Sequence, residues 1–161
     1  MRLPLLPVFL VLSTAAATPL LSSKTSVVQG NFCTTYACTL RDRRTILPET
    51  LGLLSYTYAI HGGTLIVGRE SNMAIISASL DLPPSSWNQS VVRDFLRNFI
   101  GLQIEPNTLR RCVRLAMYTG SSVPTPLISG TQGTLSFSAD CQAQASGNVL
   151  LTVQDQSFQP R

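Results

Sequence analysis

The fold is decided by residues 54–69, which read LSYTYAIHGGTLIVGR. In the first half of this stretch, large apolar residues alternate with small ones, which is the period-two pattern of a β-strand with one buried face. The expected buried positions are Leu54, Tyr56, Tyr58 and Ile60. The sequence His61-Gly62-Gly63 then predicts a tight hairpin turn, because glycine adopts the positive φ angles that such turns require. Residues 64–69 return as a second strand.

A third strand is expected directly after this hairpin. Residues 73–80 form a mainly apolar run, which follows a turn at residues 70–72 and precedes Pro83 and Pro84. Proline has no backbone N–H and cannot continue a central strand. Three consecutive strands joined by short turns predict an antiparallel meander.

The best-marked helix follows the two prolines. Ser86 and Gln89 have the spacing of a capping box, in which each side chain bonds the free backbone N–H of the other residue. Apolar residues then recur every three to four positions, namely Val91, Val92, Phe95, Leu96, Phe99 and Ile100. Gly101 stands where a left-handed C-terminal cap is expected. We therefore expect an amphipathic helix over residues 87–100, from Trp87 to Ile100, packed across one face of the sheet.

The segment after this helix is less clearly marked. Residues 107–118 fit both helical and strand periodicity. Pro106 as a first helical residue favours a helix, but the apolar run is too short to decide. Residues 121–129 contain Pro124 and Pro126 and are expected as a loop.

A second hairpin is expected near the C-terminus, with strands at residues 134–138 and 149–153 and a turn near Gly147. The predicted fold class is therefore α+β. It comprises an antiparallel sheet, made of the three-stranded meander and the C-terminal hairpin, with one main amphipathic helix packed on it and two disulfides.

Residues 1–17 have the three parts of a secretory signal peptide. Arg2 supplies the positive start, residues 3–12 form a short apolar core, and residues 13–17 end in three alanines that suit a signal peptidase. The apolar core is shorter than the roughly 20 residues of a membrane-spanning helix. We expect a secreted or extracytoplasmic protein, in the periplasm, cell envelope or exterior, with no stable membrane span after cleavage.

The rest of the chain is expected to form one domain. Residues 18–25 are expected as a flexible leader, residues 26–155 as a single α+β domain that begins with a short strand at residues 26–32, and residues 156–161 as a polar tail. The chain has 44% hydrophobic and 12% charged residues, which is the composition of a globular protein. A monomer or a weak oligomer is expected.

The four cysteines, Cys33, Cys38, Cys112 and Cys141, all follow the signal peptide. An even number of cysteines in an exported chain predicts disulfides, and four cysteines allow three pairings. We favour Cys33–Cys38 with Cys112–Cys141. Redox or zinc chemistry is the less favoured alternative, because Cys33 and Cys38 do not have C-x-x-C spacing and the chain has a single histidine.

The sequence holds no recognisable catalytic site. No motif for a metal, a nucleotide or another cofactor is present, so no cofactor is expected. His61 stands in a predicted turn, without a nucleophile motif nearby. The eight acidic residues are scattered singly, so a hydrolase that uses a carboxylate pair remains an alternative without a marked site.

Two arginine clusters are the candidate anion-binding residues. They are Arg41, Arg43 and Arg44 in the first cluster and Arg110, Arg111 and Arg114 in the second. Guanidinium groups bind carboxylate and phosphate oxygens well, although the formal net charge of +4 is small for a dedicated polyanion binder.

The sequence therefore predicts an exported, non-catalytic binding or structural module, with an acidic envelope polymer or another exported protein as its partner. A secreted inhibitor or assembly partner, which binds another protein through a sheet edge or through the loop at residues 34–37, is a further alternative. A polyanion binder needs both arginine clusters on one face, whereas a protein-binding module needs an exposed apolar patch or an uncovered edge strand.

Export predicts a defined N-terminus for the mature protein. Cleavage after Ala17 leaves Thr18 as the first residue, which intact mass spectrometry of the protein from its native host measures directly. Retention of Met1 or Arg2 in the purified protein would contradict the signal peptide.

Overall fold

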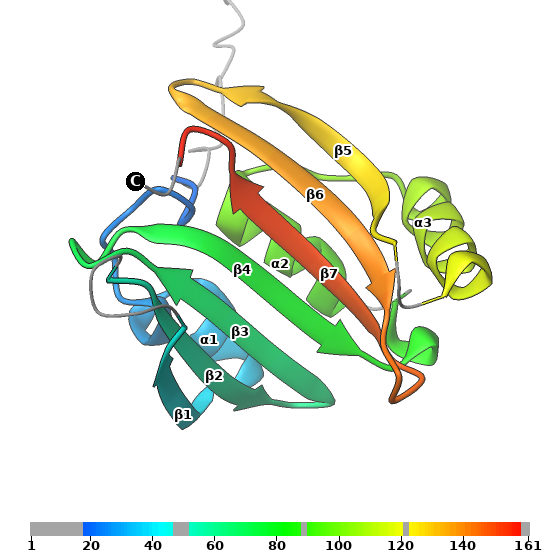
Figure 1. Ribbon diagram of the computed structural model, residues 1–161, viewed down its shortest axis with the longest axis horizontal. Helices are drawn as coiled ribbons and strands as arrows, with labels where there is room; N and C mark the ends of the chain where they lie inside the picture. The colour runs from blue at the N-terminus through cyan, green and yellow to red at the C-terminus, as the bar shows by residue number, and fades with distance from the viewer. Residues whose placement is uncertain (1–17, 47–51, 88–89, 121–122, 159–161) are drawn as a thin grey trace, which may run out of the picture.

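The computed structural model describes residues 18–46, 52–87, 90–120 and 123–158; the predicted signal peptide and its cleavage site lie outside these ranges. The described residues form a seven-stranded antiparallel sheet and three α-helices (Figure 1). The strands are β1 (Thr39–Thr45), β2 (Leu54–Ile60), β3 (Gly63–Arg69), β4 (Ile75–Leu82), β5 (Thr125–Gln132), β6 (Leu135–Ala143) and β7 (Val149–Asp155). The helices are α1 (Asn31–Tyr36), α2 (Ser90–Ile100) and α3 (Pro106–Thr119), with short 3-10 helices η1 (Val27–Gln29) and η2 (Pro84–Ser86).

The strands follow the order β1-β2-β3-β4-β7-β6-β5 across the sheet. β1 to β4 form an N-terminal meander, β5 to β7 form a C-terminal meander, and the pairing of β4 with β7 joins the two. The α+β class and the antiparallel sheet are therefore confirmed. The predicted meander and hairpin understate the sheet by two strands, β1 and β5, which are its two edges.

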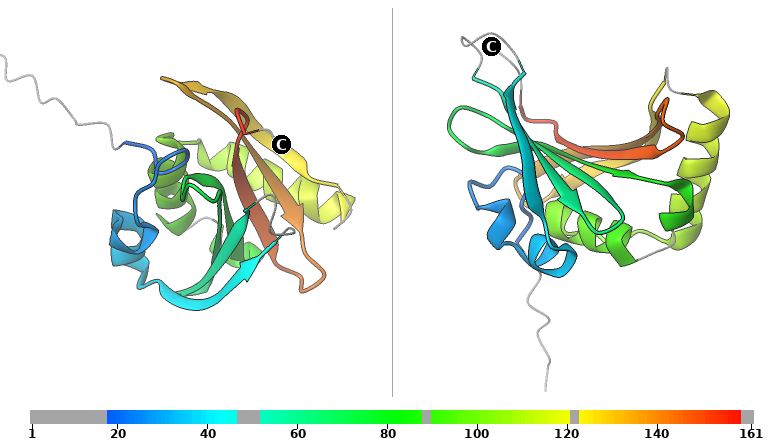
Figure 2. Two further views of the ribbon diagram at one scale, coloured as in Figure 1. Left: turned by 60° about the vertical axis from the view of Figure 1, so that its left-hand side comes forward. Right: turned by 90° about the horizontal axis from the view of Figure 1, so that it is seen from below.

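The two faces of the sheet differ in chemistry. Along one row of paired positions, Leu65 lies opposite Leu80, which lies opposite Leu151, and all three are fully buried. This inner face is covered by the helices, around which the sheet curves (Figure 2). The outer face carries small polar residues, for example Ser79 and Thr152, whose hydroxyl groups lie 3.0 Å apart. No helix covers the outer face in the described part of the chain.

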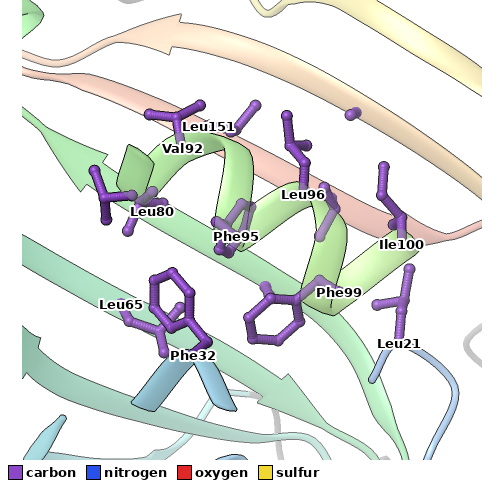
Figure 3. Close-up of a cluster of buried hydrophobic side chains, with 14 of the residues drawn as sticks. Leu21, Phe32, Leu65, Leu80, Val92, Phe95, Leu96, Phe99, Ile100 and Leu151 are labelled. Carbon is purple, nitrogen blue, oxygen red and sulfur yellow. The ribbon is translucent and has the colours of Figure 1, made fainter. Parts of the chain in front are cut away.

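The core lies between α2 and the inner face (Figure 3). The apolar stripe of α2 faces the sheet, and Phe95 and Phe99 are fully buried. Phe32 of α1 packs against both rings, with centroid distances of 6.0 and 6.2 Å in edge-on geometry. Edge-on packing of this kind is favourable for aromatic rings. α1 and α2 therefore share one aromatic cluster.

The predicted strand at residues 26–32 is wrong, because these residues form η1 and the start of α1. Burial of Val27 and Phe32 on one side requires helical turns here, not an extended chain. α1 ends at Ala37, which has a left-handed backbone with φ of 51°. This reversal brings Cys38 back to Cys33 and directs the chain into β1.

The two edge strands were not predicted, for different reasons. β1 carries Arg41, Arg43 and Arg44 and resembles a charged loop, since an edge strand has little apolar surface to bury. β5 was expected as a loop because of Pro124 and Pro126. Proline is tolerated on an edge strand, and the pairing of β5 with β6 has an irregularity between Pro126 and Ile128.

The predicted flexible leader at residues 18–25 is instead fixed against the domain. The backbone N–H groups of Leu20 and Leu21 donate to the carbonyls of Asn98 and Phe99, and both leucine side chains are buried. Arg69, only 5% exposed, donates to the carbonyl of Thr25 at 2.8 Å. The leucines complete the core at the end of α2, which a periodicity argument on so short a segment does not detect.

The helix predicted over Trp87–Ile100 begins at Ser90 in the structure. Trp87 lies at the end of η2 and is buried, and Gln89 of the predicted capping box lies outside the described residues. Residues 107–118, which the sequence leaves open, are helical in α3, with Pro106 in its first turn. Within the described ranges, no helix is long and apolar enough to cross a membrane.

Both disulfides have the favoured pairing. Cys33–Cys38 closes the short segment after α1, and Cys112–Cys141 ties α3 to β6. The described residues include no free cysteine. The second bridge spans 29 residues, and a loop of that size stabilises a fold by about 3–4 kcal/mol in the chain-entropy model.

Truncation of the aromatic cluster tests the core. Phe95→Ala is expected to lower the free energy of unfolding by about 3–5 kcal/mol, because it leaves a cavity between α2 and the sheet. Tyr118→Ala is the matched control, since this ring is 89% exposed and its removal is expected to cost no more than about 0.5 kcal/mol. Chemical denaturation measures both. A loss below about 1 kcal/mol for Phe95→Ala would mean that α2 does not pack as described.

Candidate functional site

The described residues include no arrangement of side chains that we recognise as a catalytic site. His61 lies exposed in the turn between β2 and β3, and its imidazole has no hydrogen-bond partner there. No group of three metal-binding side chains is present in the part of the chain that the structure describes.

The outer face carries two carboxylates, Asp81 on β4 and Asp140 on β6. Asp81 pairs with Leu150 of β7, whereas Asp140 pairs with Thr152, so the two acids are two strands and two residues apart. Strand geometry then separates their backbones by about 12 Å, which is too far for a direct contact between the two carboxyl groups.

The two arginine clusters lie at opposite ends of the sheet. Arg41, Arg43 and Arg44 belong to β1 at one edge, whereas Arg110, Arg111 and Arg114 belong to α3, which packs on β5 and β6 at the other (Figure 1). The structure therefore does not bring the two clusters together, because they lie at opposite edges of the sheet.

The β1 cluster is partly neutralised by its own neighbours. Arg44 forms an ion pair with Asp42 on the same strand. The Cζ atom of Arg43 lies 5.5 Å from the ring centre of Tyr56, within cation–π range. Charged side chains on an edge strand hinder the addition of another strand. This cluster therefore fits a protective role at the β1 edge.

The α3 cluster is free of ion pairs within the described residues. Arg110 donates to Asn107 on the same helix, and Arg111 and Arg114 have no hydrogen-bond partner there. All three side chains are exposed, and α3 contains no acidic residue. The helix α3 therefore presents three exposed positive charges that form no ion pair within the described residues.

The β5 edge is built differently from the β1 edge. Its sequence, TPLISGTQ, contains no charged residue, and most of its side chains are exposed. Beside it lies a groove of about 420 Å³, lined by residues that include Pro124, Pro126, Ile128, Ser138 and Asp140. The unpaired N–H and C=O groups of an uncharged edge strand are a ready template for another strand.

Exposed apolar side chains gather at this same end. They are Leu115, Met117 and Tyr118 of α3, Val123 directly before β5, and Ile128 within it. Exposed apolar residues near a positively charged helix are typical of an interaction surface. We call this set, together with the groove and the free edge of β5, the β5 docking surface. The sequence did not predict this surface, because Pro124 and Pro126 indicate a loop where β5 forms.

No known protein family, curated protein or solved structure matches this chain.

The pH dependence of stability tests whether Asp140 is buried in the groove beside β5. Burial raises the pKa of its carboxyl group, and no hydrogen bond to it is present among the described residues. Because the folded-state pKa lies above the unfolded one, stability falls as the pH rises through the window between the two values. Asp140→Asn is therefore expected to raise the free energy of unfolding at neutral pH and to change it little at about pH 3. Denaturation at both pH values measures this; an equal difference at both would contradict the burial of Asp140.

Proposed function

We propose that this protein is an exported, non-catalytic binding module of the cell envelope or exterior, and that it binds an extended segment of another exported protein along β5. The observation that carries the proposal is the uncharged, exposed edge strand with an apolar groove beside it. Main-chain hydrogen bonds to such an edge give affinity, and side-chain pockets next to it give specificity.

Export is supported by two observations. Residues 1–17 have signal-peptide character in the sequence, and the cysteines form two disulfides. Disulfides form and persist mainly in oxidising compartments outside the cytosol.

Charge favours a partner with acidic residues over a second copy of this chain. In a symmetric dimer through β5, the α3 helices of both copies would lie at the shared edge, each with three arginines and no acid. Like charges at an interface cost free energy, whereas an acidic segment would be attracted to them. We therefore propose an acidic, extended polypeptide segment as the occupant.

An acidic polymer is the second partner class that the sequence suggests. It would use the α3 arginines without the apolar groove or the edge of β5, and the β1 cluster lies at the opposite edge of the sheet. The polymer is therefore an outcome of the experiment below. No observation on the described residues favours the hydrolase alternative.

A charge placed in the docking surface tests the proposal. The purified protein captures partners from native medium and envelope fractions, and Ile128→Glu is expected to weaken capture at least about tenfold, because it buries a charge that opposes an acidic segment. Leu40→Glu on β1 is the matched control, since Leu40 is similarly exposed on the other edge. Hydrogen exchange of the captured complex is expected to protect residues 125–132.

Three results would contradict the proposal. Ile128→Glu could capture the same protein as the unmodified chain. A second copy of this chain could prove to be the occupant, with protection of β5 in a dimer. Capture could also be of an acidic polymer, lost at high salt and on neutralising the α3 arginines but unchanged in Ile128→Glu.

A further inference from the structure

A second polar surface lies on the side of α2 turned away from the sheet. Two hollows of about 320 and 220 Å³ adjoin there, and Asp94 and Arg97 line both of them. The larger hollow is closed by the connection to α3, with Gln103 and Glu105, and the smaller one by Asn31 and Thr35 of α1. Together they form the α2 groove, which is separate from the β5 docking surface.

Hydrogen bonds hold Asp94, an acidic residue that lines both hollows of this groove. The hydroxyl group of Tyr36 donates to Asp94 Oδ2 at 2.7 Å and lies 3.1 Å from Ser90 Oγ. Burial raises the pKa of Tyr36, which keeps this hydroxyl protonated as a donor. Asn98 Nδ2 donates to the carbonyl of Asp94 at 2.8 Å. The Tyr36 hydroxyl thereby joins α1 to α2 at the groove.

The two arginines of the groove are free to bind. Arg93 and Arg97 are exposed, lie one turn apart on α2, and form no hydrogen bond or ion pair within the described residues. The carboxylate nearest in sequence, Asp94, is engaged by Tyr36. Guanidinium forks bind carboxylate or phosphate oxygens with two parallel hydrogen bonds.

The charges that line the groove indicate what kind of anionic ligand it can bind. Arg93 and Arg97 face Asp94 and Glu105 in the lining of the larger hollow, so its formal charge is zero. A polyanion is therefore disfavoured. A ligand with one anionic group and several hydroxyl groups suits it better, because hydroxyl groups can donate to the two carboxylates and accept from side-chain amides such as Gln103 and Asn98.

We propose that the α2 groove binds an acidic sugar, with the sugar carboxylate held by Arg97 and Arg93 and the ring hydroxyls held by Asp94 and the neighbouring amides. The larger hollow lies near the lower end of the volumes of ligand sites, which suits a ligand of one or two sugar rings. This site does not depend on the β5 docking surface.

Titration with glucuronate tests the site, and NMR spectra of the labelled protein report which amides respond. Saturable shifts are expected in α2 and at residues 101–105. Arg97→Gln is expected to weaken binding about tenfold or more, because a charge-assisted hydrogen-bond pair is lost, and Arg97→Lys is expected to recover part of it. Arg111→Gln on α3 is the matched control and is expected to bind as the unmodified protein does. Because Arg97 is exposed, its substitution is expected to leave the fold intact. A thermal unfolding curve of each variant measures this.

Glucose and inorganic phosphate are the comparison probes. Glucose has the hydroxyl groups without the charge and is expected to bind far more weakly. Phosphate binding at the same amides with equal or higher affinity would overturn the acidic-sugar class and leave a general anion site. A glucuronate response that does not saturate, that is unchanged in Arg97→Gln, or that moves to α3 would overturn the site itself. Partner capture through β5 is measured separately and is unaffected by either result.

Discussion

The pairing of β4 with β7 is the interaction on which the rest of the structure depends. Residues 77–82 of the first meander lie opposite residues 149–154 of the second, so this ladder alone joins the two halves of the described sheet. α2 lies over the seam and contacts both strands. Its buried Phe95 and Phe99 are therefore shared by both halves, together with Phe32 of α1. A contact between segments so far apart carries a large loop-closure cost, which the burial of this aromatic cluster offsets.

This central seam determines what remains available for binding. Because α1, α2 and α3 occupy the inner face, the described sheet leaves its polar outer face and its two edges exposed. The edges are not equivalent: β1 is protected by charged side chains, while β5 is uncharged and is bordered by a groove and by exposed apolar residues. The disulfide between Cys112 and Cys141 fixes α3 beside β5, so its unpaired arginines stay at that edge. Selective protection of one edge is the property expected of a module that binds strands and does not aggregate.

The periodicity of apolar residues in the sequence predicted the helices and strands that bury a regular apolar face. It did not predict the edge strands or the sites. The stripe from Val91 to Ile100 corresponds to a buried surface, and the preferred disulfide pairing agrees with the structure. Of the alternating positions in β2, Tyr58 and Ile60 are buried, whereas Leu54 and Tyr56 are only half-buried. β1 was not predicted because a charged edge strand buries too little to show a period, and β5 was not predicted because Pro124 and Pro126 indicate a loop. Leu20 was not predicted because its burial depends on the end of α2. For the sites, the sequence identified the arginine clusters but not their separation, which follows from strand order. Arg93 and Arg97 were not among the predicted site residues, since their groove is formed only when α1 and the connection to α3 pack beside α2.

Native-state hydrogen exchange on the free protein tests the central claim most directly. An intact β4–β7 seam with an open β5 edge predicts that amides of β4 and β7 exchange only through global unfolding. The outward amides of β5 are expected to exchange much faster, at rates independent of protein concentration. Amides of β5 that exchange as slowly as those of β7, or protection of β5 that increases with protein concentration, would contradict the account, because the edge would then already be covered.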